Sequence, residues 1–352
     1  MRDELILYRI KILDKYIKYF SMFNSKKYYN NIENILPDKI NVQYESDIIE
    51  ANNSLEKLDK TLNYLQKFQY NQKIFESLFP VKMNTLAYKV FKEIESNETI
   101  ISTIKSFKPR KGYADVVSYD QVKTITGRLI NEKNSPRILT LPARCRKIFD
   151  TRWGKEGSLL YLDFKNLEPR VLRKINGKES PDDIYTDISK DLSFETDRLV
   201  IKRAIISILY GSSQKIQGLS ETRSNEVLEA VEEYFDVEKI AKEASKVNEI
   251  GCRNNFFGRP IWNIDETKEN KIMNNYVQST AVDVALSYFS EICYNIDFEF
   301  AKPVFIIHDG LVVDVHNSYK EYFVNLINKG YTCDKLGYFP IDITNLLETT
   351  IE

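Results

Sequence analysis

Two aspartates, each at the end of an apolar, strand-like segment, are the residues best suited to chemistry in this chain. Asp163 belongs to SLLYLDF and Asp309 to VFIIHDG. Between them, the segment RLVIKRAIISILYG has helical periodicity and carries Arg198, Lys202 and Tyr210. Two carboxylates can hold a pair of Mg²⁺ ions about 3.5–4 Å apart, and cations on a helix can grip a triphosphate. This order of elements predicts a two-metal nucleotidyl transferase.

Each of these features, taken alone, also has an ordinary structural explanation. A single Asp after an apolar run is usually a turn or cap residue. The helix could simply bury Ile201 and Ile205 and leave its cations in solvent. The joint appearance of all three features favours the metal site. Because the candidate ligands offer only oxygen, Mg²⁺ or Mn²⁺ is expected rather than zinc.

Composition limits the class of protein without deciding its function. The 352 residues are 43% hydrophobic and 29% charged, which predicts a folded chain of about two domains or one multi-lobed unit. Four Cys without a CxxC pair and only two His exclude a zinc finger and suit a reducing, intracellular compartment. No signal peptide and no membrane span are expected. A net charge of −1 leaves nucleic-acid binding open, because basic residues cluster at 105–111 and 144–147.

The pattern of periodicity and breakers divides the chain into four segments. Residues 1–112 form a helical arm, with helical spacing at 6–20, 55–65 and 86–94. Pro109 and Gly112 mark the change to the strands of 113–190, where Pro169 lies in the first turn of a helix. Residues 191–250 are helical, and Gly251 is expected to terminate that stretch.

The last segment, 251–352, contains the second aspartate. FGRPIW predicts a turn between short strands, and a long helix runs through Asn274, Gln278 and Asp283. A strand at 304–308, a strand at 311–315, a helix at about 318–328 and a strand at 338–343 follow. Strands early and late with helices between them predict one mixed sheet interrupted by a helical excursion.

An ordered set of further motifs resembles the family A DNA polymerases, the bacterial polymerase I type. DFKNLEPR resembles that family's DYSQIELR motif, keeping the Asp, the Glu five residues on and the Arg. The basic helix keeps the R-x3-K-x7-YG spacing. The other matches are TGRL (126–129), FGR (257–259), N-x3-Q-S-T-A-x-D (274–283) and HD (308–309). Together they cover about residues 113–352.

The resemblance implies a fold and a reaction. The fold would be α+β, a right-hand polymerase with an antiparallel palm sheet and mostly helical thumb and fingers. Residues 1–112 would be a thumb-like arm, 113–190 and 251–352 the two parts of the palm, and 191–250 reduced fingers. The reaction would be template-directed DNA synthesis with Mg²⁺, or Mn²⁺, on primer–template DNA and dNTPs. With no acidic exonuclease set before residue 110, no proofreading is expected, and a separate exonuclease, helicase or processivity factor would be a partner.

The resemblance also assigns roles to residues. Asp163 and Asp309 would bind metal and, with Lys202, form the catalytic set. Glu168 would be the steric gate against a 2′-hydroxyl. The nucleotide-binding residues would be Arg198, Lys202, Ile206, Tyr210 and Glu168. The DNA-binding residues would be Arg128, Arg259, Asn274, Gln278 and His308, the first four facing the minor groove, where every Watson–Crick pair offers acceptors.

The chain departs from the family pattern in three places. The usual HDE is His308-Asp309-Gly310, so a carboxylate beside the metal site is lost. Ile206 stands where an aromatic is usual, and Arg198 follows Asp163 by only 35 residues, which predicts trimmed fingers. Two alternatives stay open: a single-subunit phage-type RNA polymerase, which also lacks Glu after HD, and a catalytically inactive polymerase-like DNA-binding subunit.

Overall fold

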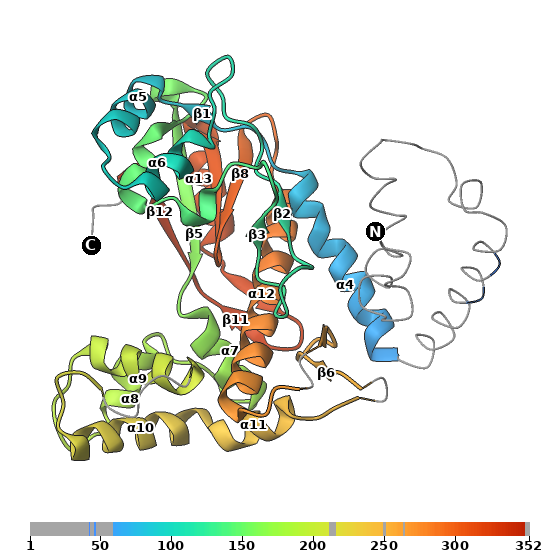
Figure 1. Ribbon diagram of the computed structural model, residues 1–352, viewed down its shortest axis with the longest axis vertical. Helices are drawn as coiled ribbons and strands as arrows, with labels where there is room; N and C mark the ends of the chain where they lie inside the picture. Colours follow the sequence, from blue (N-terminus) through green and yellow to red (C-terminus); the bar gives the residue numbers. More distant parts are fainter. Residues whose placement is uncertain are drawn as a thin grey trace.

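A four-stranded antiparallel sheet forms the centre of the molecule. The computed structural model describes residues 59–210, 216–248, 251–262 and 265–348, together with Val42 and Ser46. The strand order is β12 (Ile341–Asn345), β5 (Gly157–Phe164), β9 (Gly310–His316) and β8 (Ala301–Ile307) (Figure 1). All three strand pairs are antiparallel. The α+β class and the antiparallel sheet are therefore confirmed, and the mixed sheet expected from the pattern of elements is wrong.

The strands form where apolar, β-branched residues dominate. β8 and β9 are buried over nearly their whole length, as their continuous apolar sequences require. β5 alternates toward its end: Leu162 and Phe164 are buried, whereas Tyr161 and Asp163 lie half-buried on the opposite face. The side chain of Asp163 is thus directed away from the packed core.

A long helix, α12 (Glu269–Asn295), joins the sheet to the helices in the lower part of Figure 1. It is buried along most of its length, so it is apolar around much of its circumference rather than on one stripe. The ring of Phe164 in β5 packs against Tyr288 of α12, with 5.6 Å between ring centroids. α4 (Asp59–Glu76) lies alongside α12. The predicted long helix is confirmed.

After α7, the chain contains α8 (Ile184–Ser189), which lies in the segment expected to be palm. It continues with α9 (Arg198–Tyr210), α10 (Glu221–Phe235) and α11 (Val237–Ala244), which lie in the segment expected to be the fingers. Asp183 and Ser220 cap α8 and α10 by accepting backbone N–H bonds. Gly251 does not terminate a helix, which corrects the sequence prediction. α11 ends seven residues earlier at Ala244, and the Gly251 N–H donates to the Asn248 carbonyl in a turn.

Short elements complete the fold. α7 (Leu167–Ile175) follows β5 directly and has Pro169 in its first turn, as predicted. Within FGRPIW, the FGR residues lie in the turn between β6 (Arg253–Asn254) and β7 (Pro260–Ile261), as predicted, and β7 is the Pro-Ile of the same motif. The remaining helices are α5 (Thr85–Ile94), α6 (Glu98–Lys105) and α13 (Asn317–Ile327), with 3₁₀ turns at Ile138–Thr140, Ala143–Ile148 and Gly154–Glu156. The remaining strands are β1 (Lys82–Met83), β2 (Tyr119–Asp120), β3 (Ile130–Asn131), β4 (Phe149–Asp150), β10 (Tyr331–Cys333) and β11 (Gly337–Phe339).

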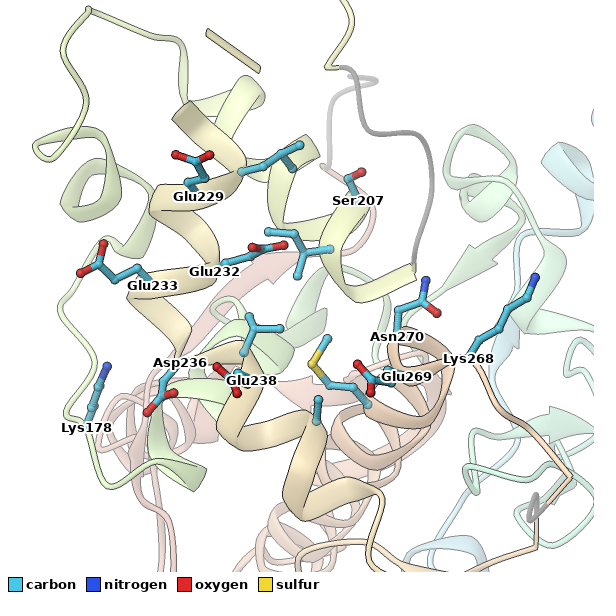
Figure 2. A pocket seen from close by; sticks show the side chains of 15 residues that line it. Lys178, Ser207, Glu229, Glu232, Glu233, Asp236, Glu238, Lys268, Glu269 and Asn270 are labelled. Atoms are coloured by element: carbon cyan, nitrogen blue, oxygen red, sulfur yellow. The ribbon is translucent and has the colours of Figure 1, made fainter. Parts of the chain in front are cut away.

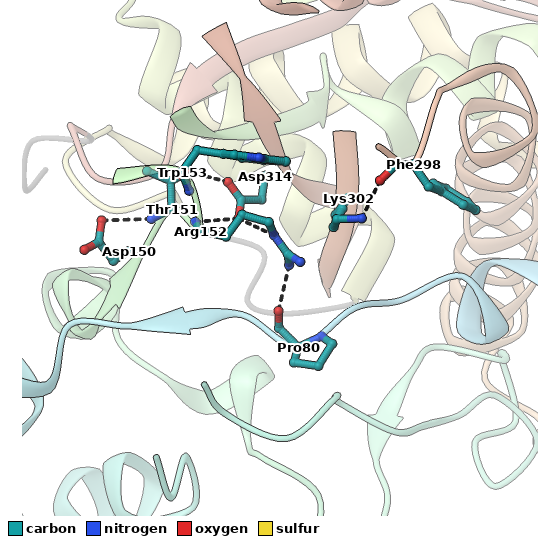
Figure 3. Close-up of polar contacts among 8 residues, drawn as sticks. All are labelled: Pro80, Asp150, Thr151, Arg152, Trp153, Phe298, Lys302 and Asp314. Atoms are coloured by element: carbon teal, nitrogen blue, oxygen red, sulfur yellow. Dashed lines mark hydrogen bonds and ion pairs between the residues drawn. The ribbon is translucent and has the colours of Figure 1, made fainter. Parts of the chain in front are cut away.

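A buried ion pair connects the sheet to the segment that follows α4 (Figure 3). Asp314 of β9 is fully buried and accepts bonds from the Thr151 hydroxyl at 2.6 Å and from Nε of Arg152 at 3.0 Å. The Arg152 guanidinium also donates to the carbonyl of Pro80 at 2.8 Å. A buried carboxylate is tolerated only with such partners. The contact therefore fixes the chain after α4 against the palm sheet.

The N-terminal arm is represented by α4 and the elements after it. The helices expected within 6–20, and the beginning of the one expected at 55–65, lie outside the described residues. Within the described ranges, no helix is long and apolar enough to cross a membrane.

Candidate active site

The two candidate metal ligands meet through strand pairing. Asp163 is the cross-strand partner of Gly310, the residue that follows Asp309. Ile307 pairs with Gly310, so His308 and Asp309 are the two residues of the tight loop between β8 and β9. His308 has a φ of 53°, in the left-handed region that non-glycine residues rarely adopt. Such a loop holds Asp309 beside the end of β5 with little freedom.

Both carboxylates are largely shielded from water, and this raises their pKa values. Burial raises the pKa of Asp163 to about 6, with a further contribution from the neighbouring charges of Asp309 and Asp342. Burial also raises the pKa of Asp309, against the opposing influence of Arg128 and His308. Like charges at one desolvated site disfavour each other's ionised form. A bound cation would remove that penalty.

Glu168 lies in the first turn of α7 and joins three other elements. Its carboxylate lies near Gln278 of α12 and Tyr210 of α9, whose polar groups act to lower its pKa against the effect of burial. The Gln278 carbonyl oxygen also accepts a bond from the Thr126 hydroxyl at 2.8 Å. Burial and the charge of Asp309 raise the pKa of Glu168, and the Arg128 guanidinium opposes that shift. TGRL, DFKNLEPR, the basic helix and α12 thus converge beside the aspartates.

The basic helix α9 divides cleanly into two faces. Ile201, Ala204, Ile205 and Leu209 are buried. The opposite stripe has a spacing of four residues, so its members lie above one another. It consists of Arg198, Lys202, Ile206 and Tyr210, all exposed. The apolar face is thus structural, and the cationic face is open to a ligand; Gly211 lies outside the described residues.

Most of the predicted DNA-binding residues surround this cluster. Arg128 and His308 both have solvent-exposed surface. Enough protein surrounds the His308 imidazole for desolvation to lower its pKa, and the charge of Arg128 lowers it further. Asn274 and Gln278 are half-buried and one helical turn apart on α12. The Oδ1 atom of Asn274 is buried and has no hydrogen-bond partner among the described residues. An unsatisfied polar atom beside a candidate site is suited to a ligand.

Arg259 is placed differently from the expectation. It is only 3% exposed, and its guanidinium donates to the Tyr64 hydroxyl and to the backbone carbonyl of Gln121, each at 2.9 Å. Tyr64 in turn donates to Asp283 at 3.2 Å. In this arrangement Arg259 cannot reach a duplex. It links α4, α12 and the FGR turn, and the expected minor-groove contact is not supported by its position.

Sequence reasoning missed two residues beside Asp163. Asp342 of β12 is its partner on the other neighbouring strand and forms an ion pair with Lys165 at 2.8 Å. Tyr161 lies two residues before Asp163, on the same face of β5, and close enough to its carboxylate for each group to affect the other's pKa. The alternation of β5 could have indicated Tyr161. Nothing in the local sequence indicated Asp342, because its place depends on a pairing of strands far apart in the chain.

Two large hollows differ in charge. One, of about 1040 Å³, includes Arg128 and His308. Its other charged lining residues are mainly basic: Lys105, Lys108, Arg110, Lys133 and Arg137, with Asp115 and Glu132. The second, of about 1160 Å³, lies between α9, α10, α11 and α12, and carboxylates dominate its rim (Figure 2). Phosphate would be repelled there, so the basic hollow is the one that extends the site.

Comparison with known proteins settles the family. The model of DNA polymerase family A matches residues 21–336. The chain belongs to DNA polymerase family A. A search of curated proteins found no match.

Among solved structures, this family A chain is similar to the polymerase domain of Pol1 from M. smegmatis, determined with DNA primer-template and dNTP. The two are 16% identical, with a TM-score of 0.55 over 70% of this chain and 51% of that one. The likeness shows the fold. The chain matches about half the length of that structure.

The donor set of this family A polymerase fits a hard divalent cation. Asp163 and Asp309 supply carboxylate oxygens, the ligands preferred by Mg²⁺ and Mn²⁺. Within the described ranges, no group of three or more His, Cys, Asp or Glu side chains is arranged to hold a metal ion. Two protein carboxylates leave coordination positions for water and for phosphate oxygens, as Mg²⁺ requires.

The raised pKa of Asp163 predicts that its charge destabilises the metal-free fold. A folded-state pKa of about 6, above the usual 3.8, means that folding disfavours the ionised form at neutral pH. In EDTA at pH 7.5, Asp163→Asn should therefore raise the free energy of unfolding by roughly 1–3 kcal/mol. The gain should shrink toward pH 5, because protonation of the wild type removes the same cost.

Urea unfolding at both pH values measures this effect. Asp191→Asn, at an exposed position, is the matched control and should change little. A lower stability of Asp163→Asn at pH 7.5 would contradict the proposed electrostatic strain.

Proposed function

We propose that this chain is a template-directed DNA polymerase that adds deoxynucleotides to a primer 3′ end by two-metal phosphoryl transfer. The observation that carries the proposal is the pairing of Asp163 with Gly310, which sets two desolvated carboxylates side by side. Family membership supports the same reaction. The similar Pol1 structure was determined with DNA primer-template and dNTP, which supports those two partners for this chain.

Asp163 and Asp309 would hold Mg²⁺, with Mn²⁺ as a substitute. A bound pair of ions activates the attacking hydroxyl and stabilises the leaving pyrophosphate. Asp163, at the end of β5, and Asp309, in the β8–β9 loop, orient that pair from two adjacent strands. The protein's task is to keep both carboxylates ionised and fixed.

The exposed stripe of α9 would bind the incoming nucleotide. Arg198 and Tyr210 are twelve residues apart, so the stripe spans about 18 Å, enough for a triphosphate at one end and a base at the other. The start of α9 is already occupied, because the Asp197 carboxylate accepts the Leu199 N–H at 2.9 Å. The side-chain cations Arg198 and Lys202, rather than the helix N-terminus, would therefore neutralise the phosphates.

DNA would be bound on the opposite side of the aspartates from α9. The basic hollow that begins at Arg128 and His308 suits the phosphate backbone. Asn274 and Gln278 would contact the minor groove at the primer end, where acceptors are common to all base pairs. Arg259 would instead fix the position of α4 relative to α12.

Glu168 favours DNA synthesis over the RNA polymerase alternative. It lies close enough to Asp309, Gln278 and Tyr210 for each of them to act on its pKa. A 2′-hydroxyl at this place would collide with it or leave a buried carboxylate without partners, which costs a few kcal/mol. The lack of proofreading, and a separate exonuclease, helicase or processivity factor, stay predictions.

Removing either aspartate tests the reaction. Asp163→Asn and Asp309→Asn should each lower primer extension about 1000-fold or more, because several kcal/mol of metal-dependent stabilisation are lost. Binding of primer–template should be retained, since no cation is removed. Extension by Asp191→Asn is the control. Wild-type rates in both active-site variants would exclude the two-metal mechanism, and an inactive wild type would favour the non-catalytic DNA-binding subunit.

Lys202 should act on the phosphates during transfer. Lys202→Ala is expected to lower kcat/KM for the incoming nucleotide by about 100-fold, with unchanged primer–template affinity. Arg203→Ala is a matched control, because Arg203 is the next residue of α9 and equally exposed but off the stripe. Single-turnover incorporation measures both. Equal losses in the two variants would mean that general charge, not the stripe, binds the triphosphate.

Glu168 should determine whether the enzyme selects deoxyribonucleotides or ribonucleotides. The wild type is expected to prefer dNTPs strongly, and Glu168→Ala should reduce that preference by about 100-fold by admitting rNTPs, with some loss of dNTP efficiency. Glu168→Gln, which keeps the bulk of the side chain, should retain more of the discrimination. Competing single incorporations of dNTP and rNTP measure the ratio. Equal use of both sugars by the wild type would support the RNA polymerase instead.

A further inference from the structure

Tyr161 fills the space beside Asp309 that a side chain at position 310 would occupy. A Cβ atom added to Gly310 would come within 3.0 Å of Cε2, Cζ and the hydroxyl oxygen of Tyr161. Gly310 is not among the glycines with positive φ, so its backbone does not demand glycine. The ring of Tyr161 is therefore what excludes a larger residue at position 310.

Strand geometry explains how Tyr161 reaches this place. Its direct cross-strand partner is Val312, which makes Gly310 a diagonal neighbour within reach of a long aromatic side chain. Two residues further along the same face of β5 is Asp163. The Tyr161 hydroxyl donates to the backbone carbonyl of Ile307 at 3.4 Å. It also lies close enough to the Asp163 carboxylate for the two groups to shift each other's pKa. The phenol thus reaches from β5 to β8 through the space that a side chain at position 310 would occupy.

We propose that Tyr161 is a positioning residue for the metal site, whose hydroxyl fixes the Asp163 carboxylate and takes the place left by a glycine after His308-Asp309. This inference rests on the proposed two-metal function. A hydrogen bond to a ligating carboxylate orients it toward the ion, and loss of such a partner typically costs about 10–100-fold in metal affinity. Gly310 provides no carboxylate at this place. The better orientation of the Asp163 carboxylate compensates for that loss without adding negative charge.

The charges around Tyr161 agree with this role. A phenol keeps its proton at neutral pH, so the Tyr161 hydroxyl can donate. The guanidinium of Arg146 lies 6.0 Å from the ring centroid. A neutral donor adds no further negative charge to a site where two carboxylates already repel each other.

Tyr161→Phe separates the hydroxyl from the ring. Mn²⁺ binding is titrated by electron paramagnetic resonance, with dideoxy-terminated primer–template and a non-hydrolysable dNTP analogue held constant. The Mn²⁺ bound by the Asp163→Asn variant defines the level of binding without the metal site. The Tyr161→Phe variant should bind Mn²⁺ about tenfold more weakly, require about tenfold more Mg²⁺ for half-maximal extension, and recover most of its rate at saturating metal. Its urea midpoint should match that of the wild type, because the ring remains.

A paired exchange tests the spatial argument. Gly310→Glu alone should be impaired, since Tyr161 occupies the space, and Tyr161→Ala alone should bind Mn²⁺ weakly. The double variant Tyr161→Ala/Gly310→Glu should bind Mn²⁺ more tightly than Tyr161→Ala. Unchanged Mn²⁺ affinity in Tyr161→Phe, with an active wild type, would overturn this inference alone. A wild type that binds no more Mn²⁺ than Asp163→Asn would overturn the proposed function and this inference with it.

Discussion

The antiparallel pairing of β5 with β9 is the constraint on which the rest of the site depends. It places Asp163 opposite Gly310 and next to the loop that carries Asp309, so two carboxylates share one poorly solvated place. The raised pKa values of both groups express the cost of that arrangement. The surrounding groups either reduce the cost, as Arg128 does, or fix the geometry, as the left-handed His308 does. The proposed binding site for cations would thus be built by the pairing of these strands.

The remaining elements are attached to this sheet by buried contacts, and in the proposed function they would orient the substrates relative to it. α12 carries Gln278 toward Glu168 and, through its buried length, joins the palm to the fingers helices. The buried ion pair of Asp314 with Arg152 attaches the chain after α4 to β9. Arg259, bonded to Tyr64, attaches α4 itself. Buried, hydrogen-bonded charges of this kind fix orientation more than they add stability.

The sequence predicted those parts that local patterns determine. The basic helix, the β8–β9 hairpin and the long helix were predicted because periodicity and turn residues specify them within a short window. The convergence of TGRL, Glu168 and Gln278 was predicted through the family resemblance. The antiparallel sense of the sheet was also predicted only through that resemblance, whereas the pattern of elements alone suggested a mixed sheet. The burial of Arg259 and the proximity of Asp342 were not predicted, because each depends on segments far apart in the chain. Tyr161 was overlooked because its role requires the space left by Gly310, which only the cross-strand register reveals.

The most direct test of the central claim is anomalous diffraction from a crystal of the wild-type chain with Mn²⁺, a dideoxy-terminated primer–template and an incoming dNTP. The account predicts two anomalous peaks roughly 3.5–4 Å apart, both coordinated by Asp163 and Asp309, with the triphosphate along Arg198 and Lys202. A nucleotide bound along α9 with no anomalous peak at the two aspartates would contradict it.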